Sequence, residues 1–84
     1  MTPNPDVWEE IERMLQSLID LQETKVLALA RRLKPGLTAE DVRNAHDHRE
    51  LDDADLQFED GTLAGLLAAQ AAVRARRRER SQGS

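Results

Sequence analysis

The strongest constraint on the fold is a helical repeat of apolar residues in the first part of the chain. From Trp8 to Leu33, apolar side chains recur mostly at intervals of three to five residues, which predicts an amphipathic helix with a broad apolar face. Asn4-Pro5 suits the start of such a helix, and Lys34-Pro35-Gly36 suits its end. We therefore expect a helix over about residues 5–33.

Two further helices are expected after this first one. Thr38 is placed to cap a short helix over about residues 39–45, and Asp41 can complete a capping box with it. A second long helix is expected over about residues 60–78, with a start that the sequence leaves open within residues 55–62. The many glycines and alanines of this helix make it slender, so that a neighbouring helix can approach it closely.

Together these elements predict an all-α protein, an antiparallel helical hairpin with a short helix in its corner. We expect one domain over residues 1–80 and a flexible tail over residues 81–84. Two helices with broad apolar faces cannot enclose each other, and no cysteine is present to staple the hairpin. The sequence therefore predicts that two copies share one core in a homodimeric four-helix bundle.

The expected dimer interface consists of the apolar residues on the inner faces of the two long helices. They are Trp8, Ile11, Met14, Leu15, Leu18, Leu21, Leu29, Leu63, Leu66, Leu67 and Val73. Polar residues interrupt these faces, and Gln22 or Gln70 placed across the dimer axis would fix the register of the helices.

The connection between the long helices raises the question of a metal site, because residues 46–61 contain two histidines and seven carboxylates. The candidate zinc ligands are His46, His48, Asp52 and Asp53. A calcium loop that starts at Asp53 fails, because Phe58 stands where a glycine is needed and Ala64 where a glutamate is needed. We interpret the segment as a structural connection that turns Leu51, Leu56 and Phe58 inward, and its acidic surface remains a candidate for binding a partner.

Arginines concentrate at the end of the second long helix. The candidate anion-binding residues are Arg74, Arg76, Arg77, Arg78 and Arg80. In an antiparallel hairpin they would also lie beside the acidic start of the first helix, which carries Asp6, Glu9, Glu10 and Glu12. By the same geometry Glu59 and Asp60 would lie near Arg31, Arg32 and Lys34. We expect internal pairing to account for most of this charge asymmetry, and nucleic-acid binding is the alternative.

The sequence offers no constellation for catalysis. It has no cysteine, and no glycine-rich phosphate loop or nucleophile elbow surrounds any of its hydroxyl side chains. No apolar run reaches the roughly 20 residues that cross a bilayer, and no signal peptide is visible, so we expect a cytoplasmic protein. We expect a non-enzymatic oligomerisation or protein-interaction module without a cofactor, which acts as an adaptor, a regulator or a small subunit. The alternatives are a nucleic-acid-associated protein and a metal-binding protein.

Overall fold

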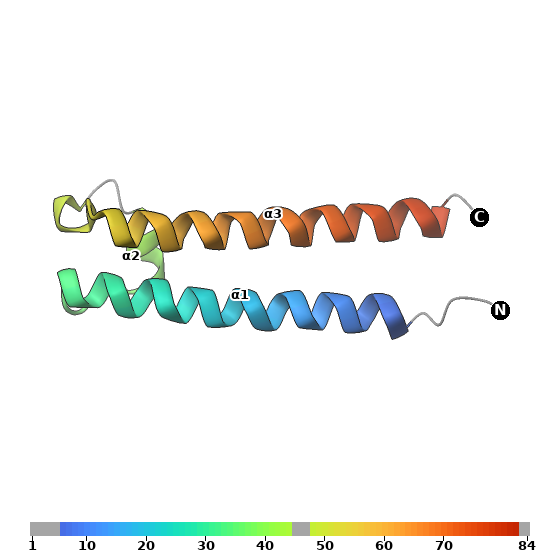
Figure 1. Cartoon of the computed structure of the whole chain (residues 1–84), viewed down its shortest axis with the longest axis horizontal. Coiled ribbons are helices and arrows are strands. Elements are labelled where there is room, and N and C mark those ends of the chain that lie inside the picture. The colour runs from blue at the N-terminus through green and yellow to red at the C-terminus, as the bar shows by residue number, and fades with distance from the viewer. Residues whose placement is uncertain (1–5, 45–47, 83–84) are drawn as a thin grey trace.

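The computed structural model describes residues 6–44 and 48–82 and contains no strand in them (Figure 1). Its elements are α1 (Asp6–Leu33), α2 (Ala39–Arg43), the 3-10 helix η2 (Arg49–Leu51) and α3 (Ala54–Gln82). The prediction of an all-α protein is therefore confirmed, and η2 adds a short helical turn to what was expected to be an irregular connection.

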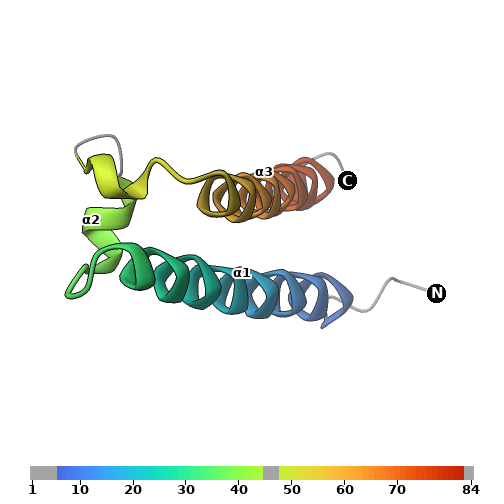
Figure 2. The same ribbon diagram turned by 60° about the vertical axis from the view of Figure 1, so that its left-hand side comes forward.

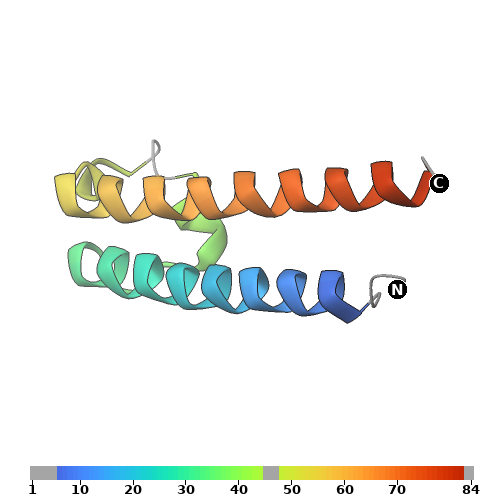
Figure 3. The same ribbon diagram turned by 45° about the vertical axis from the view of Figure 1, so that its right-hand side comes forward.

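The two long helices form an antiparallel hairpin that measures 53 × 19 × 18 Å along its principal axes. Figures 1 and 3 both show α1 and α3 side by side over most of their length. The short helices join them at one end (Figure 2), which we call the closed end. At the opposite, open end, α1 begins and α3 terminates.

The turn after α1 has a backbone reason. Gly36 has a φ of 86°, in the left-handed region that glycine adopts without a steric penalty and that commonly ends helices. Arg31 Nε donates a hydrogen bond to the backbone oxygen of Leu37 at 2.8 Å, which holds the turn against α1. Helix α1 thus ends where the sequence predicts, at Leu33.

The capping box predicted for α2 is present. The hydroxyl oxygen of Thr38 accepts a hydrogen bond from the backbone N–H of Asp41, and the Asp41 carboxylate accepts one from the backbone N–H of Thr38. The helix ends at Arg43, two residues before the predicted end.

Helix α3 begins at Ala54, one residue before the range 55–62 in which the sequence left its start open. The expected bound near residue 60 is wrong. The side chain of Asp53 accepts a hydrogen bond from the backbone N–H of Leu56 at 3.0 Å, which satisfies one of the free donors in the first turn. Gly61 therefore lies inside the helix. At the other end, Ser81 belongs to the last turn of α3 rather than to a tail.

The buried core is small and lies mostly at the closed end. The buried hydrophobic residues among those described are Ile19, Val26, Ala30, Leu37, Leu51 and Leu56. All except Ile19 form one cluster. No described side chain is buried in α1 before Ile19 or in α3 after Gln70, so the open half of the hairpin has no enclosed core of its own.

Candidate interaction surface

The apolar residues that the sequence places at an interface fall into two groups. Most are half-buried where α1 and α3 face each other: Trp8, Ile11, Leu15, Leu29, Leu63, Leu66 and Val73. Four are exposed, namely Met14 (60%), Leu18 (46%), Leu21 (70%) and Leu67 (44%). The first group explains how the hairpin holds together, and the second leaves apolar surface in contact with solvent.

Helix α1 presents a row of exposed apolar side chains. Val7, Met14, Leu18 and Leu21 are separated by seven, four and three residues, which places them on one face of the helix. The exposed Ala28 continues the row seven residues after Leu21. This face therefore carries large apolar side chains in its middle and a small one towards the closed end.

Helix α3 presents a face of small residues instead. No charged residue occurs between Asp60 and Arg74. Within this stretch, Gly65, Ala69 and Ala72 are exposed, and their spacing of four and three residues places them on one face. A Cβ atom added at Gly65 would meet nothing within 4 Å, so the surface there is open.

The register between the two helices follows from two polar contacts. Gln70 Nε2 donates a hydrogen bond to Gln16 Oε1 at 2.9 Å, and Arg74 Nε lies 3.5 Å from Glu12 Oε1. In both pairs the residue numbers add up to 86, so residues of α1 and α3 whose numbers add up to about 86 lie at nearly the same level. Gln70 is used within one hairpin, and this contact differs from its predicted place across a dimer axis.

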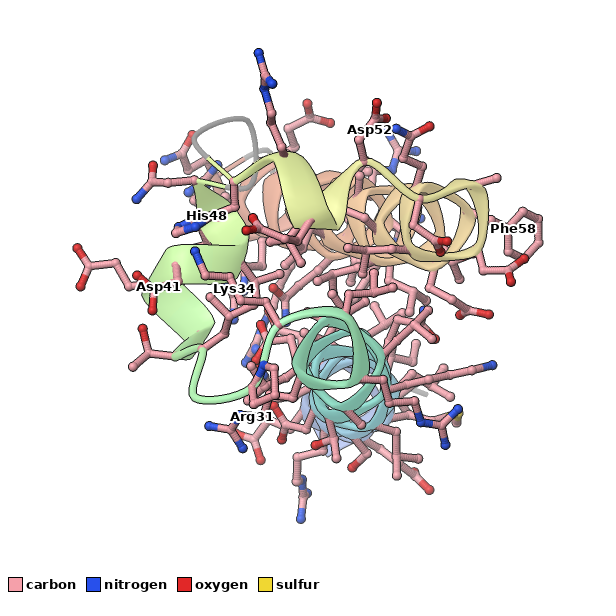
Figure 4. The ribbon with its side chains drawn as sticks, turned by 90° about the vertical axis from the view of Figure 1, so that its left-hand side faces the viewer. Arg31, Lys34, Asp41, His48, Asp52 and Phe58 are labelled. Carbon is pink, nitrogen blue, oxygen red and sulfur yellow. The ribbon has the colours of Figure 1, made fainter. Side chains whose placement is uncertain are left out.

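Phe58 points outward, and the prediction that it turns inward is wrong. It is 72% exposed, whereas Leu51 and Leu56 are buried as predicted. Residues two apart on a helix point in nearly opposite directions, so the helical start of α3 cannot bury both Leu56 and Phe58. Figure 4 shows Phe58 projecting from the side of the hairpin away from α2. There it borders a hollow together with Ala28 and Arg32.

Glu59 links α3 to the middle of α1. Its carboxylate accepts a hydrogen bond from Gln22 Nε2 at 2.7 Å and lies 3.0 Å from Lys25 Nζ. The hydrogen bond from Gln22, followed by that from Lys25, lowers the pKa of this carboxyl below its ordinary value. The partner of Glu59 is therefore Lys25 rather than the predicted basic residues within 31–34, and Gln22 is used inside the hairpin.

At the open end, Glu12 confirms the predicted pairing of the arginines with the acidic start of α1. Its two carboxylate oxygens are paired with Arg74 and Arg77. The side chain of Glu12 is 22% exposed, so this contact is partly shielded from water. A single carboxylate thus pairs with two of the five arginines.

The other three arginines are exposed. Arg76 lies 3.4 Å from Glu79 one turn along the same helix. Arg78 and Arg80 form no ion pair with the part of the chain that the structure describes. A small group of cations therefore faces solvent at the end of α3.

His48 is engaged with the end of α1. Lys34 Nζ lies 2.9 Å from His48 Nδ1 and 3.8 Å from a carboxylate oxygen of Glu50, and Figure 4 shows Lys34 beside His48. His46 lies outside the described residues.

The remaining candidate metal ligands serve the start of α3. Asp52 accepts a hydrogen bond from Gln57 Nε2 at 2.9 Å, and Asp53 caps the helix. Over residues 6–44 and 48–82, no three histidine, aspartate or glutamate side chains gather in a geometry that could hold a metal ion. The described candidates are therefore not brought together.

Asp41 is the second carboxyl whose pKa is lowered. Its Oδ2 atom accepts hydrogen bonds from the backbone N–H and the hydroxyl of Thr38, both at 3.0 Å. These two bonds favour the ionised form, and the nearby His48 and Lys34 make smaller contributions in the same direction. The capping box and the basic end of α1 thus stabilise the same negative charge.

Comparison with known proteins gives no relative: no protein-family model, no curated protein and no solved structure matches the chain. In the described part of the chain, no helix is both long and apolar enough to span a membrane. The function must therefore be inferred from the surfaces of the hairpin.

Sequence reasoning missed four residues of the exposed surface, which are Val7, Ala28, Ala69 and the outward-pointing Phe58. A pattern that could have identified Ala69 is the uncharged stretch over residues 61–73. On a two-helix hairpin, an uncharged stretch of that length must place uncharged side chains on the outer surface as well as the inner one.

Proposed function

We propose that the protein is a non-enzymatic interaction module and that its working unit is a homodimeric four-helix bundle, which serves as an adaptor, a regulator or a small subunit of a larger assembly. One observation carries this proposal: the open half of the hairpin has no buried side chain of its own. The exposed apolar row of Met14, Leu18 and Leu21 begins in this half.

The physical reason is that two helices bury too little apolar surface to be stable alone. Burial contributes about 25 cal/mol per Å², and six buried hydrophobic side chains must offset the loss of conformational entropy of the ordered chain. A second hairpin packed on the first supplies the missing contacts without disulfides or metals. Stability and assembly are therefore coupled in this proposal.

Sedimentation velocity and light scattering over a wide dilution series test the proposal. We expect a species of twice the 9.5 kDa chain mass at high concentration. On dilution, helical circular dichroism should decrease together with the dimer, because the open half loses its partner. A monomer that keeps its full helicity and a cooperative thermal transition at every concentration would overturn the proposal.

Nucleic-acid association is a second candidate function, and it is favoured by the exposed Arg78 and Arg80, which lack ion pairs among the described residues. In that case, replacing Arg76, Arg78 and Arg80 with glutamine should abolish retention on heparin. The same three replacements should leave the helical content unchanged, because none of these arginines contacts α1 in the ion pairs of the hairpin. Equal retention of the natural protein and of the triple variant on heparin would exclude this candidate.

A further inference from the structure

We propose that two copies pair in one specific way: α1 of each copy lies antiparallel along α3 of the other, around a two-fold axis that runs parallel to the helices. This inference rests on the proposed function and adds the surface and the geometry through which the second copy binds. The surface, which we call the docking face, consists of Met14, Leu18 and Leu21 of α1 and Gly65, Ala69 and Ala72 of α3.

At three levels of the hairpin, the docking face has a large residue of α1 beside a small residue of α3. The register defined by Gln16 with Gln70 and Glu12 with Arg74 places Met14 at the level of Ala72. By the same register, Leu21 lies at the level of Gly65, and Leu18 lies within one residue of the level of Ala69. The large side chains of Met14, Leu18 and Leu21 thus form a ridge on α1. Gly65, Ala69 and Ala72 form a flat strip beside it on α3.

At one further level the large residue lies on α3 and the small residue lies on α1. Phe58 stands seven residues before Gly65, and Ala28 seven residues after Leu21, so both extend the same two rows. They border one hollow, which shows that the two rows open on the same side of the hairpin.

A second copy fits this pattern because of how a two-fold axis acts on it. An axis parallel to the helices keeps every residue at its level and exchanges the positions of α1 and α3. Leu18 then meets the partner's Ala69, and Phe58 meets the partner's Ala28, so that a large residue packs against a small one at these levels. An axis perpendicular to the helices would instead oppose ridge to ridge and strip to strip, which leaves gaps.

Charges beside the docking face complement each other in the same arrangement. Glu10 would lie level with the partner's Arg76, and Arg32 would lie within one residue of the level of the partner's Asp55. All four side chains are exposed in the single hairpin. Opposite charges at both ends of an apolar strip favour this pairing over a shifted or reversed one.

The size and position of the docking face suit a stable dimer. The side of the hairpin that carries the docking face is about 42 Å long, the length of the 28 residues of α1, and 19 Å wide. Its outline of about 800 Å² gives room for an interface of the size that each partner buries in a specific complex. Phe58 lies on the side of the hairpin away from α2 (Figure 4), so α2 does not obstruct this face.

Cysteine cross-linking between two differently tagged chains tests the arrangement, since the natural sequence contains no cysteine. Chains carrying Leu18→Cys mixed with chains carrying Ala69→Cys should form a mixed disulfide, because the small partner residue lets the two backbones approach. Leu18→Cys alone should not cross-link to itself, because diagonal helices lie beyond the roughly 7 Å limit for a disulfide. A disulfide between two Leu18→Cys chains, without any mixed disulfide between Leu18→Cys and Ala69→Cys chains, would overturn the arrangement.

A matched pair of substitutions tests the docking face by affinity. Ala69→Leu and Ala71→Leu make the same change at two exposed positions of α3, which point to opposite flanks of the helix. We expect Ala69→Leu to weaken dimerisation about tenfold or more by overfilling the strip, and Ala71→Leu to leave it unchanged. Equal effects of the two substitutions would contradict the proposal.

The outcomes separate this inference from the proposed function. A natural chain that is monomeric at every concentration would overturn both. A dimer that forms normally but resists Ala69→Leu and yields only self-linked Leu18→Cys would overturn the docking arrangement and leave the interaction module standing.

Discussion

Gln70 Nε2 of α3 donates a hydrogen bond to Gln16 Oε1 of α1 at 2.9 Å, and Gln70 is the one buried polar residue among those described. The contact sits where the buried part of the hairpin gives way to the open half. A polar pair at this place fixes the register of α1 against α3, because any shift along the helices would leave the amide of Gln70 buried without a partner.

Replacing Gln70 separates its role in register from its contribution to stability. Gln70→Ala should lower the free energy of unfolding by about 1–2 kcal/mol, because it removes the hydrogen bond and leaves a cavity. Gln70→Leu should leave stability equal or higher, because an apolar side chain of similar size fills the site and the exposed Gln16 returns to water. Urea unfolding at one fixed protein concentration measures both, and a loss in Gln70→Leu as large as in Gln70→Ala would contradict this account.

The start of α3 depends on Asp53. Asp53→Ala should lower the free energy of unfolding by about 1 kcal/mol, because the backbone N–H of Leu56 loses its acceptor. Asp53→Asn should retain most of the stability. The neighbouring Asp52→Ala removes only an exposed contact with Gln57 and should change stability by less than about 0.5 kcal/mol. Hydrogen exchange at the Leu56 amide gives an independent measurement, and equal effects of Asp52→Ala and Asp53→Ala would refute the capping role.

The helices with clear terminal residues could be predicted from the sequence. Pro35 and Gly36 mark the end of α1, and Thr38 with Asp41 marks the start of α2, because each of these residues acts on its own neighbours. The start of α3 could not be predicted in the same way. Asp53 stands in a run of carboxylates, and composition alone does not show which of them caps the helix.

The exposed surface was harder to predict than the hairpin. Apolar periodicity identifies a helix but cannot divide its apolar residues between its own hairpin and a partner. Leu15 and Leu18 illustrate this, because they are one turn apart and yet half-buried and exposed, respectively. The inward direction predicted for Phe58 failed because it assumed an irregular chain, and the helical phase of α3 determines its true direction.

The open end depends on the charge of Glu12. Glu12→Gln keeps the shape of the side chain but removes the charge that Arg74 and Arg77 share, so stability should fall by about 1 kcal/mol or less. The loss should shrink at high salt, which screens partly exposed pairs. Glu9→Gln, at an exposed position on the same turn, serves as the control and should melt like the natural protein. The melting temperature in low and high salt measures the effect, and a salt-independent loss would show that charge is not its cause.

Stability should fall in acid because the pKa values of Asp41 and Glu59 are both lowered in the folded protein. Near neutral pH both groups are ionised in the folded and unfolded chains, and their stabilisation is fully present. As the pH falls below the ordinary values of 4.5 for glutamate and 3.8 for aspartate, the unfolded chain takes up protons first. The stabilisation is then lost progressively until the pH lies below the folded pKa values.

Melting temperatures measured from neutral pH down to about pH 3 should therefore stay constant near neutral pH and decline once the pH falls below the ordinary carboxyl pKa values. Glu59→Gln should decline less steeply, since its amide does not titrate, whereas the exposed Glu23→Gln should follow the natural protein. An unchanged acid slope in Glu59→Gln would show that the contact with Gln22 and Lys25 does not contribute to acid sensitivity.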